Sequence, residues 1–256
     1  MKILKSICFL VLLLVNMISF SQLKNDTLSF KKVDFSKNLK FNYKQLIIPT
    51  ALVTYGIIGQ GNNGIRDLNF NIRSQVLANS NRIGIDDYIQ YLPAATNFGL
   101  SAIGVEGKHN FKDKLIITAT AALIMGTVVT TTKYTVKEVR PDGSAANSFP
   151  SGHTANAFMG AELLYQEYKD VSPWYGISGY VVAASTGILR IQNNRHWLTD
   201  VAAGAGIGIL SAKAAYWLFP LVNKIFTKSE ANSQTKTAFL PFYDGKNTGF
   251  GLVSTF

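Results

Sequence analysis

The turn Pro150-Ser151-Gly152-His153, just ahead of an apolar helical stretch, combines groups that can bind an anion with one that can donate a proton. A turn that leads into a helix leaves backbone N–H groups unpaired, and the helix dipole favours a negative charge there. Gly152 permits close approach of the anion, Ser151 adds a hydroxyl donor, and His153 can supply a proton. The sequence therefore predicts a phosphate-binding turn with an acid beside it.

Two cations precede this turn in the stretch KYTVKEVRP, where Lys133 is followed after six residues by Arg140. Both lie on the segment that leads into the turn, so both side chains can face the same anion. A guanidinium offers a planar, two-pronged match to phosphate oxygens, and an ammonium supplies a compact charge. We expect Lys133 and Arg140 to bind the anion that the turn receives.

A third charged segment follows the turn in LRIQNNRHWLTDVAAG, which holds Arg190, His196 and Asp200. His196 and Asp200 are four residues apart, so on a helix they share one face. A carboxylate at hydrogen-bonding distance fixes the tautomer of an imidazole and leaves its other nitrogen free to attack. His196 is therefore the candidate nucleophile, Asp200 its orienting partner, and Arg190 a third cation.

Six apolar stretches must position these groups, at roughly 46–60, 91–105, 115–132, 154–168, 174–189 and 199–219. They lack strict alternation, and most are too long for strands. Residues 64–90 offer a further amphipathic helix. The sequence predicts an all-α fold, a six-helix bundle over residues 45–222, in which an up-and-down arrangement brings the three charged segments to one end.

The three blocks K-x6-RP, PSGH and R-x5-H-x3-D, in this order, resemble the signature of the type-2 phosphatidate phosphatase and vanadium haloperoxidase superfamily. The blocks cover residues 133–200, and the similarity of the helical arrangement extends to roughly 46–219. The family usually has serine before the arginine of the third block, where this chain has Leu189. That departure removes a minor polar contact and leaves the main residues in place.

This resemblance implies a metal-independent phosphatase whose nucleophile is His196, which would form a phosphohistidine with the support of Asp200. His153 would protonate the leaving alcohol. The phosphoryl oxygens would be held by a set of cations and donors: Lys133, Arg140, Arg190, Ser151 and the Gly152 amide. No cofactor is expected, and the sequence has no HExxH or clustered ligand set for a metal.

The composition favours a membrane-associated protein or an unusually apolar globule, because only 16% of the residues are charged and 47% are hydrophobic. Soluble domains usually carry about 25% charged residues. The formal net charge of +10 suits an anionic lipid surface or a phosphorylated substrate. Nucleic acid is a weaker interpretation, because no basic run is interleaved with aromatic residues.

Residues 1–21 have the layout of a secretory signal peptide, with a basic start, an apolar run from Ile7 to Val15 and small residues near Ser21. An uncleaved anchor helix is the alternative. The only cysteine, Cys8, lies in this segment, so cleavage would leave no thiol for disulfides, catalysis or metal binding. Residues 22–44 are predicted to form an exposed polar arm, and residues 223–256 a tail with a β-hairpin-like turn at Asp244-Gly245.

Two stretches come near the length that crosses a bilayer, about 20 residues: Leu115–Thr132 and Val171–Leu189, both uncharged. Glu162 and Lys213 make the fourth and sixth stretches poorer candidates. If the leader is cleaved and all six helices span, the third ends in the cytoplasm. We therefore expect either a retained leader or fewer spans, with the active site facing the periplasm; a soluble periplasmic protein is the alternative.

The expected activity is hydrolysis of phosphoesters in the cell envelope, with lipid phosphates favoured: polyprenyl diphosphate, phosphatidate or lipid A phosphate. Three alternatives stay open from the sequence. They are a soluble periplasmic acid phosphatase of broad specificity, a vanadate-dependent haloperoxidase, and a structural envelope protein with a degenerate site. The oligomeric state is not indicated by any pattern.

Overall fold

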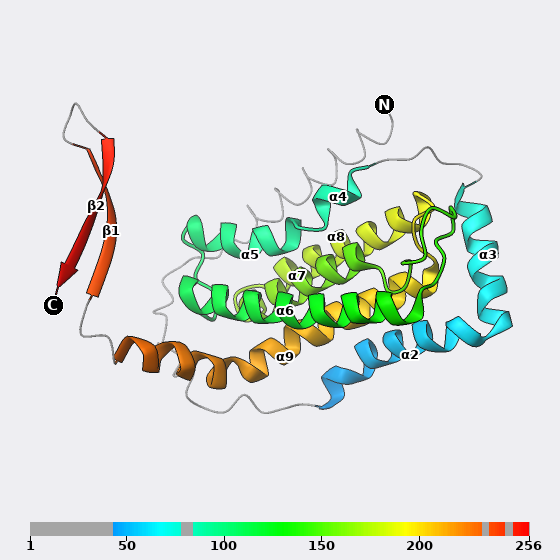
Figure 1. Cartoon of the computed structure of the whole chain (residues 1–256), viewed down its shortest axis with the longest axis horizontal. Coiled ribbons are helices and arrows are strands. Elements are labelled where there is room, and N and C mark those ends of the chain that lie inside the picture. Colours follow the sequence, from blue (N-terminus) through cyan, green and yellow to red (C-terminus); the bar gives the residue numbers. More distant parts are fainter. Residues whose placement is uncertain (1–42, 78–83, 232–235, 244–247, 256) are drawn as a thin grey trace. The chain divides into compact units, whose positions relative to one another are not determined.

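In the computed structural model, the described residues are 43–77, 84–231, 236–243 and 248–255, and most of them are helical (Figure 1). The chain divides into two compact units, Met1–Trp217 and Leu218–Phe256. In chain order the elements are η1 (Tyr43–Leu46), α2 (Ile47–Gly61), α3 (Asn63–Leu77), α4 (Asp86–Ile89), α5 (Leu92–Ala102), α6 (Phe111–Val136), α7 (Gly152–Tyr168), α8 (Pro173–Gln192), α9 (Leu198–Ala231), β1 (Lys236–Tyr243) and β2 (Thr248–Thr255).

The expected helical fold is confirmed, but the described residues hold eight α-helices rather than six. The six apolar stretches correspond to α2, α5, α6, α7, α8 and α9. The amphipathic segment that follows the first stretch forms α3. α4 has only four residues, which is too short to give a helical period in the sequence.

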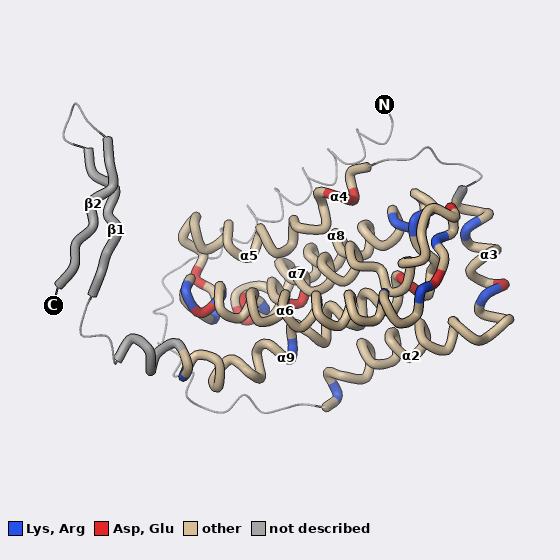
Figure 2. The backbone as a smooth tube through the Cα atoms, viewed as in Figure 1, with Lys and Arg blue, Asp and Glu red and all other residues tan. Residues whose placement is uncertain are grey.

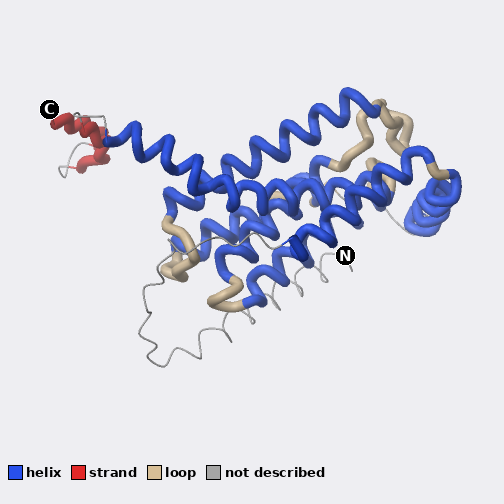
Figure 3. Tube along the Cα trace, turned by 90° about the horizontal axis from the view of Figure 1, so that it is seen from below, coloured by secondary structure: helices blue, strands red, loops and turns tan. Residues whose placement is uncertain are grey.

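Helix α7 lies at the centre of the first unit and packs against α5, α6 and α8. Small residues let its neighbours come close: a Cβ on Gly160 would collide with the backbone of Ala94 in α5, and one on Gly204 of α9 would collide with the carbonyl of Ser151. Figure 3 shows that the loops joining these helices gather at the ends of the bundle. Close packing of α7 thus fixes the end at which its first residues lie.

We expect Gly208→Ala to destabilise the bundle, because a Cβ there would lie deep within van der Waals contact of the Ala155 carbonyl. Overpacking against backbone costs about 1–3 kcal/mol. The matched control is Gly126→Ala on α6, where the added Cβ meets no described atom within 4 Å and alanine favours the helix. Thermal unfolding of both variants in detergent should give a lower Tm for the first only; equal Tm values would contradict the packing argument.

Charged residues lie mostly toward the two ends of the bundle (Figure 2). Among the described residues, two helices are long and apolar enough to cross a membrane, Phe111–Val136 and Leu198–Ile225. Only 17% of the α6 window is buried, and side chains such as Leu115 and Leu123 are exposed. Val171–Leu189, the stretch that corresponds to α8 and that the sequence offered as a membrane span, is not among these candidates. Helix α9 is a candidate, although Lys213 made its stretch a poorer one in the sequence.

The reason that Lys213 does not disturb α9 is its pairing with Glu162 of α7. The Lys213 Nζ lies 2.6 Å from Glu162 Oε1, and both side chains are buried. Tyr180 donates a further hydrogen bond to the same carboxylate. The two charges that interrupt the apolar stretches therefore neutralise each other inside the bundle.

In the second unit, β1 and β2 pair antiparallel, with Lys236 opposite Thr255 and Tyr243 opposite Thr248. The Asp244-Gly245 turn lies outside the described residues, as do the predicted leader 1–21 and residues 22–42 of the predicted arm. The limits of the leader and the arm stay predictions.

Candidate active site

The three charged segments meet where α6 ends and α7 and α9 begin. Helix α6 ends at Val136 and is capped by Lys137, whose left-handed backbone (φ 52°) turns the chain into the loop 137–151. Among the backbone hydrogen bonds that hold this loop, the Ser148 N–H donates to the Glu138 carbonyl at 2.9 Å, and the Ser151 N–H donates to the Asp200 carbonyl at 3.0 Å. The second bond ties the turn before α7 to the first turn of α9.

His196 and Asp200 form a buried pair, with 2% and 0% of their surface exposed. The Asp200 Oδ2 lies 3.4 Å from His196 Nδ1 and accepts hydrogen bonds from the Ser148 hydroxyl at 2.5 Å and the Trp197 N–H at 2.9 Å. The last bond makes Asp200 part of the N-terminal cap of α9. A carboxylate held by these donors keeps the Nδ1 side of the imidazole occupied and leaves Nε2 for another partner.

The surroundings of His196 keep its ring uncharged. Burial lowers the pKa of His196 well below its usual range, and positive charge on four neighbours, Arg190, Lys133, Arg140 and His153, lowers it further. These four residues come from three separate segments of the sequence, and all lie close enough to act on one imidazole. The structure therefore brings the predicted cations and both predicted histidines together.

Arg190 is held from α4, by a residue that the sequence analysis missed. Its Nη1 lies 2.5 Å from Asp86 Oδ2, and Asp86 also accepts a hydrogen bond from Asn193 at 2.9 Å. Arg190 is 6% exposed and Asp86 1%. The buried Nε of Arg190 has no hydrogen-bond partner among the described residues, so it is available to an anion.

His153 also has a carboxylate partner on α4. Its Nε2 lies 2.8 Å from Asp87 Oδ1, and the Asp87 side chain is 62% exposed. Asp87 lies 3.7 Å from Arg190 as well. The adjacent residues Asp86 and Asp87 thus orient a cation and the predicted acid at the same time, one in the interior and one at the surface.

Lys133 and Arg140 are positioned by Asn147, another residue that the sequence analysis missed. The Lys133 Nζ donates to the Asn147 carbonyl at 2.5 Å, and the Arg140 Nε donates to the Asn147 side-chain oxygen at 2.8 Å. One residue of the loop therefore sets the position of both cations of the first block.

Ser151 and Gly152 lie at the start of α7 as predicted, but the hydroxyl of Ser151 has another task. Ser151 is the N-cap of α7, fully buried, and its Oγ lies 2.9 Å from Thr154 Oγ1 and accepts from the Thr154 N–H at 3.4 Å. Serine is among the best N-cap residues. The turn can still bind an anion through the backbone N–H groups at the start of α7, where Gly152 and His153 lie.

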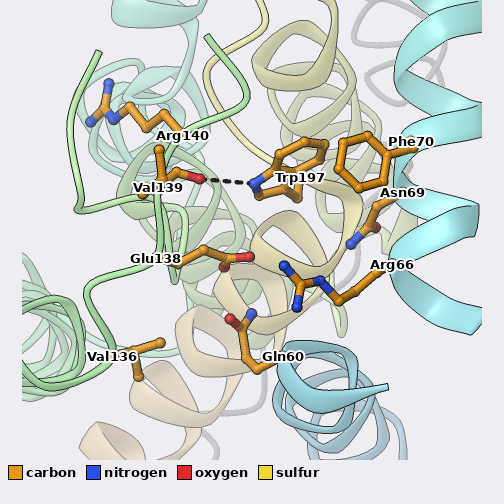
Figure 4. A pocket seen from close by; sticks show the side chains of 9 residues that line it. All are labelled: Gln60, Arg66, Asn69, Phe70, Val136, Glu138, Val139, Arg140 and Trp197. Atoms are coloured by element: carbon orange, nitrogen blue, oxygen red, sulfur yellow. Dashed lines mark hydrogen bonds between the residues drawn. The ribbon is translucent and has the colours of Figure 1, made fainter. Parts of the chain in front are cut away.

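A cavity of about 300 Å³ opens beside the site (Figure 4). Arg140 and Glu138 line one side of it and Arg66 and Phe70 of α3 the other. Trp197 donates its indole N–H to the Val139 carbonyl at 3.0 Å and lines the cavity. Cations and aromatic rings in one cavity suit a phosphorylated headgroup.

In the described part of the chain, no group of three or more His, Cys, Asp or Glu side chains is arranged so that it could hold a metal ion. The functional groups that the structure assembles are two imidazoles, three cations and supporting carboxylates. Such a set can bind a phosphoryl group and transfer it to an imidazole.

Comparisons with known proteins found one family and two curated relatives. Residues 114–224 match the family described as the PAP2 superfamily. A lipid A 1-phosphatase of Porphyromonas gingivalis is 39% identical over 177 residues, which cover 69% of this chain and 38% of that protein. The bacitracin transport permease protein BcrC of Bacillus licheniformis is 33% identical over 101 residues, covering 40% of this chain and 48% of that protein. The matches thus span less than half the length of both relatives.

Two solved structures are similar at low identity. Aquifex aeolicus LpxE has a TM-score of 0.48 and 21% identity, over 59% of this chain and 95% of that one. A transmembrane PAP2 type phosphatidylglycerolphosphate phosphatase from Bacillus subtilis has a TM-score of 0.45 and 22% identity, over 75% of this chain and 99% of that one.

Proposed function

From the PAP2 superfamily domain that this chain carries at residues 114–224, we propose that the protein is a lipid phosphatase of the cell envelope that works through a phosphohistidine. The observation that carries the proposal is His196, a buried imidazole whose Nδ1 faces the Asp200 carboxylate and whose pKa is lowered by burial and by the positive charges of nearby cations. Cations gathered around a nucleophile repel each other unless an anion lies among them, and a phosphoryl group is such an anion.

In the first step, the Nε2 lone pair of His196 attacks phosphorus. The P–N bond forms as the bond from phosphorus to the leaving oxygen breaks, and His153 gives its proton to that oxygen. The negative charge on the remaining phosphoryl oxygens is stabilised by Lys133, Arg140 and Arg190, whose buried Nε has no partner among the described residues. Asp200 stabilises the positive charge that develops on the His196 ring.

In the second step, water attacks phosphorus on the other side of the P–N bond. His153, now neutral, takes a proton from the water, the P–N bond breaks, and inorganic phosphate leaves. His196 returns to its uncharged form and His153 to its protonated form, so one turnover consumes one water and regenerates both imidazoles.

Lipid phosphates are the substrates that the molecule suits best. The exposed apolar surface of α6 fits contact with acyl chains, and the cationic site lies at the end of that helix. Among polyprenyl diphosphate, phosphatidate and lipid A phosphate, we favour the last, because the 39% identical relative is a lipid A 1-phosphatase. The cavity beside the site has the volume and the aromatic lining for a sugar headgroup.

The test is release of inorganic phosphate by the purified full chain in detergent, with a chelator present, from lipid A, phosphatidate, polyprenyl diphosphate and a soluble aryl phosphate. We expect release from lipid A, undiminished by the chelator. No release from any of the four would overturn the proposal. Release from the aryl phosphate alone, by protein that salt washes off membranes, would instead support the soluble acid phosphatase.

A further inference from the structure

Two carboxyl groups lie side by side behind the nucleophile, and the mechanism above uses only one of them. Glu138, in the loop after α6, is within hydrogen-bonding reach of Asp200. Each has a buried oxygen with no partner among the described residues, Oε2 of Glu138 and Oδ1 of Asp200. Two carboxylates cannot hydrogen-bond to each other, whereas a carboxylic acid and a carboxylate can. One proton between the two groups would satisfy both oxygens.

The distribution of donors around Asp200 indicates that Glu138 carries the proton, because one oxygen of Asp200 lacks a donor. Its Oδ2 already faces three donors, from Ser148, the Trp197 backbone and His196. The Oδ1 has none in the described structure. The Asp200 carboxylate is thus held through one oxygen only, so its rotation about the Cβ–Cγ bond is resisted from one side. A donor on Oδ1 would fix the plane of the Asp200 carboxylate, and with it the direction in which Oδ2 meets the imidazole.

The groups around Glu138 favour its neutral form at ordinary pH. Asp200 faces it from α9, Gln60 from α2 and Arg66 from α3, and Figure 4 shows Glu138, Gln60 and Arg66 pointing toward one another. Burial, with the charge of Asp200 alongside, raises the pKa of Glu138 to about 8, although Gln60 and the positive charge of Arg66 act in the opposite sense. The positive charge of Lys133 on α6 acts on Asp200.

We infer, resting on the proposed function, that Glu138 is a positioning residue: as a carboxylic acid it donates a hydrogen bond to Asp200 Oδ1 and so holds Asp200 against His196. Its action on the reaction passes through Asp200, because neither oxygen of Glu138 bonds to a histidine in the described structure. The inference also explains why an acidic side chain stands in a segment that otherwise supplies cations to an anion.

The inference has a defined pH dependence. Below about pH 8 the acid is protonated and donates; above it, deprotonation removes the donor and sets two carboxylates against each other. Activity that depends on this bond is therefore present at neutral pH and falls as pH rises. Glu138→Gln keeps a donor at the same place that does not titrate, so it should escape this fall.

The experiment compares kcat of wild type, Glu138→Gln and Glu138→Ala with lipid A across pH. We expect Glu138→Ala to lose about tenfold or more at about pH 7, since it leaves a buried acceptor unpaired. Glu138→Gln should recover most of that loss. The ratio of Glu138→Gln to wild type should rise about tenfold between about pH 7 and pH 9. Taking the ratio cancels the titration of Lys133 and His153, which both proteins share.

Asp142→Asn is the matched control. It removes a carboxylate from the same loop, but this carboxylate contacts Arg195 and not Asp200. The ratio of the kcat of Asp142→Asn to that of wild type should not change with pH. A second readout needs no turnover: the infrared carbonyl band of a protonated carboxyl should be present in wild type at about pH 7, weaken by about pH 9 and be missing in Glu138→Gln.

The outcomes separate the inference from the proposed function. A wild type without activity on any phosphoester overturns the proposed function, while the infrared band still reports the proton. An active wild type with a ratio that stays flat across pH overturns the inference alone. So does a Glu138→Gln variant as impaired at about pH 7 as Glu138→Ala. If Glu138→Ala fails to fold, the Glu138→Gln ratio carries the test by itself.

Discussion

His196→Ala should abolish phosphate release, lowering kcat by roughly 10⁴-fold or more, the scale on which loss of a nucleophile acts in enzymes that form covalent intermediates. In the described structure His196 is the imidazole that faces the Asp200 carboxylate, and its burial among cations keeps its lone pair free of a proton. The three cations stay in place, so the variant should still bind phosphate. Initial rates with lipid A, at matched amounts of folded protein, measure the effect.

The control is His109→Ala, which removes an imidazole at the other end of α6. His109 Nδ1 lies 2.7 Å from Glu167 Oε1, and His109 precedes α6, whereas Lys133 lies in its last turn. A helix of 26 residues is about 39 Å long, so this change is far from the site. We expect His109→Ala to keep its activity even if its Tm falls. A His196→Ala variant within tenfold of wild type would refute the assignment of the nucleophile.

The residues that could be predicted from the sequence are those that chemistry places at fixed spacing. His196 and Asp200 meet because they lie at the start of one helix, and the three segments converge because α6, α7 and α9 end or begin at the same place. Helical periodicity and the order of the blocks contain this information. The local pattern therefore sufficed to predict that His196, Asp200 and the cations lie together, whereas their catalytic roles stay predictions.

The supporting residues could not be predicted in the same way, because their contacts join distant parts of the chain. Asp86 and Arg190 are 104 residues apart. Glu138 lies in the loop after α6, which has no periodic pattern from which its proximity to Asp200 could be predicted. One signal was present: Asp86 and Asp87 are adjacent carboxylates in the apolar stretch IGIDDYIQYL. A carboxylate in such surroundings needs a cation, and the sequence had already predicted three cations for the site.

Two differences from expectation have local physical causes. Ser151 was expected to bind phosphate, but the helix that begins after it needs a cap, and a buried hydroxyl satisfies that need first. Glu162 and Lys213 were interpreted as obstacles to apolar helices. Their pairing across α7 and α9 depends on how the two helices face each other, which sequence alone does not specify.

The pair of Asp86 and Arg190 predicts the largest loss of stability. In Asp86→Ala the guanidinium of Arg190 stays buried without its anion, and breaking a buried ion pair from one side costs about 3–5 kcal/mol. The hydrogen bond that Asn193 donates to Asp86 is lost as well. We expect a lower free energy of unfolding, measured by chemical denaturation in detergent, and a lower kcat, because Arg190 is no longer held toward the phosphoryl group.

Asp87→Asn is the comparison that separates stability from catalysis. Asp87 makes the same kind of contact with Arg190 but at 3.7 Å and with a side chain that is 62% exposed, so water screens its charge. Its stability should stay near that of wild type, whereas kcat should fall because His153 loses the carboxylate that orients it.

Added inorganic phosphate should raise the Tm of Asp86→Ala more than that of Asp87→Asn, since the anion supplies the charge that buried Arg190 lacks. An Asp86→Ala protein within about 1 kcal/mol of wild type would show that Arg190 does not depend on Asp86.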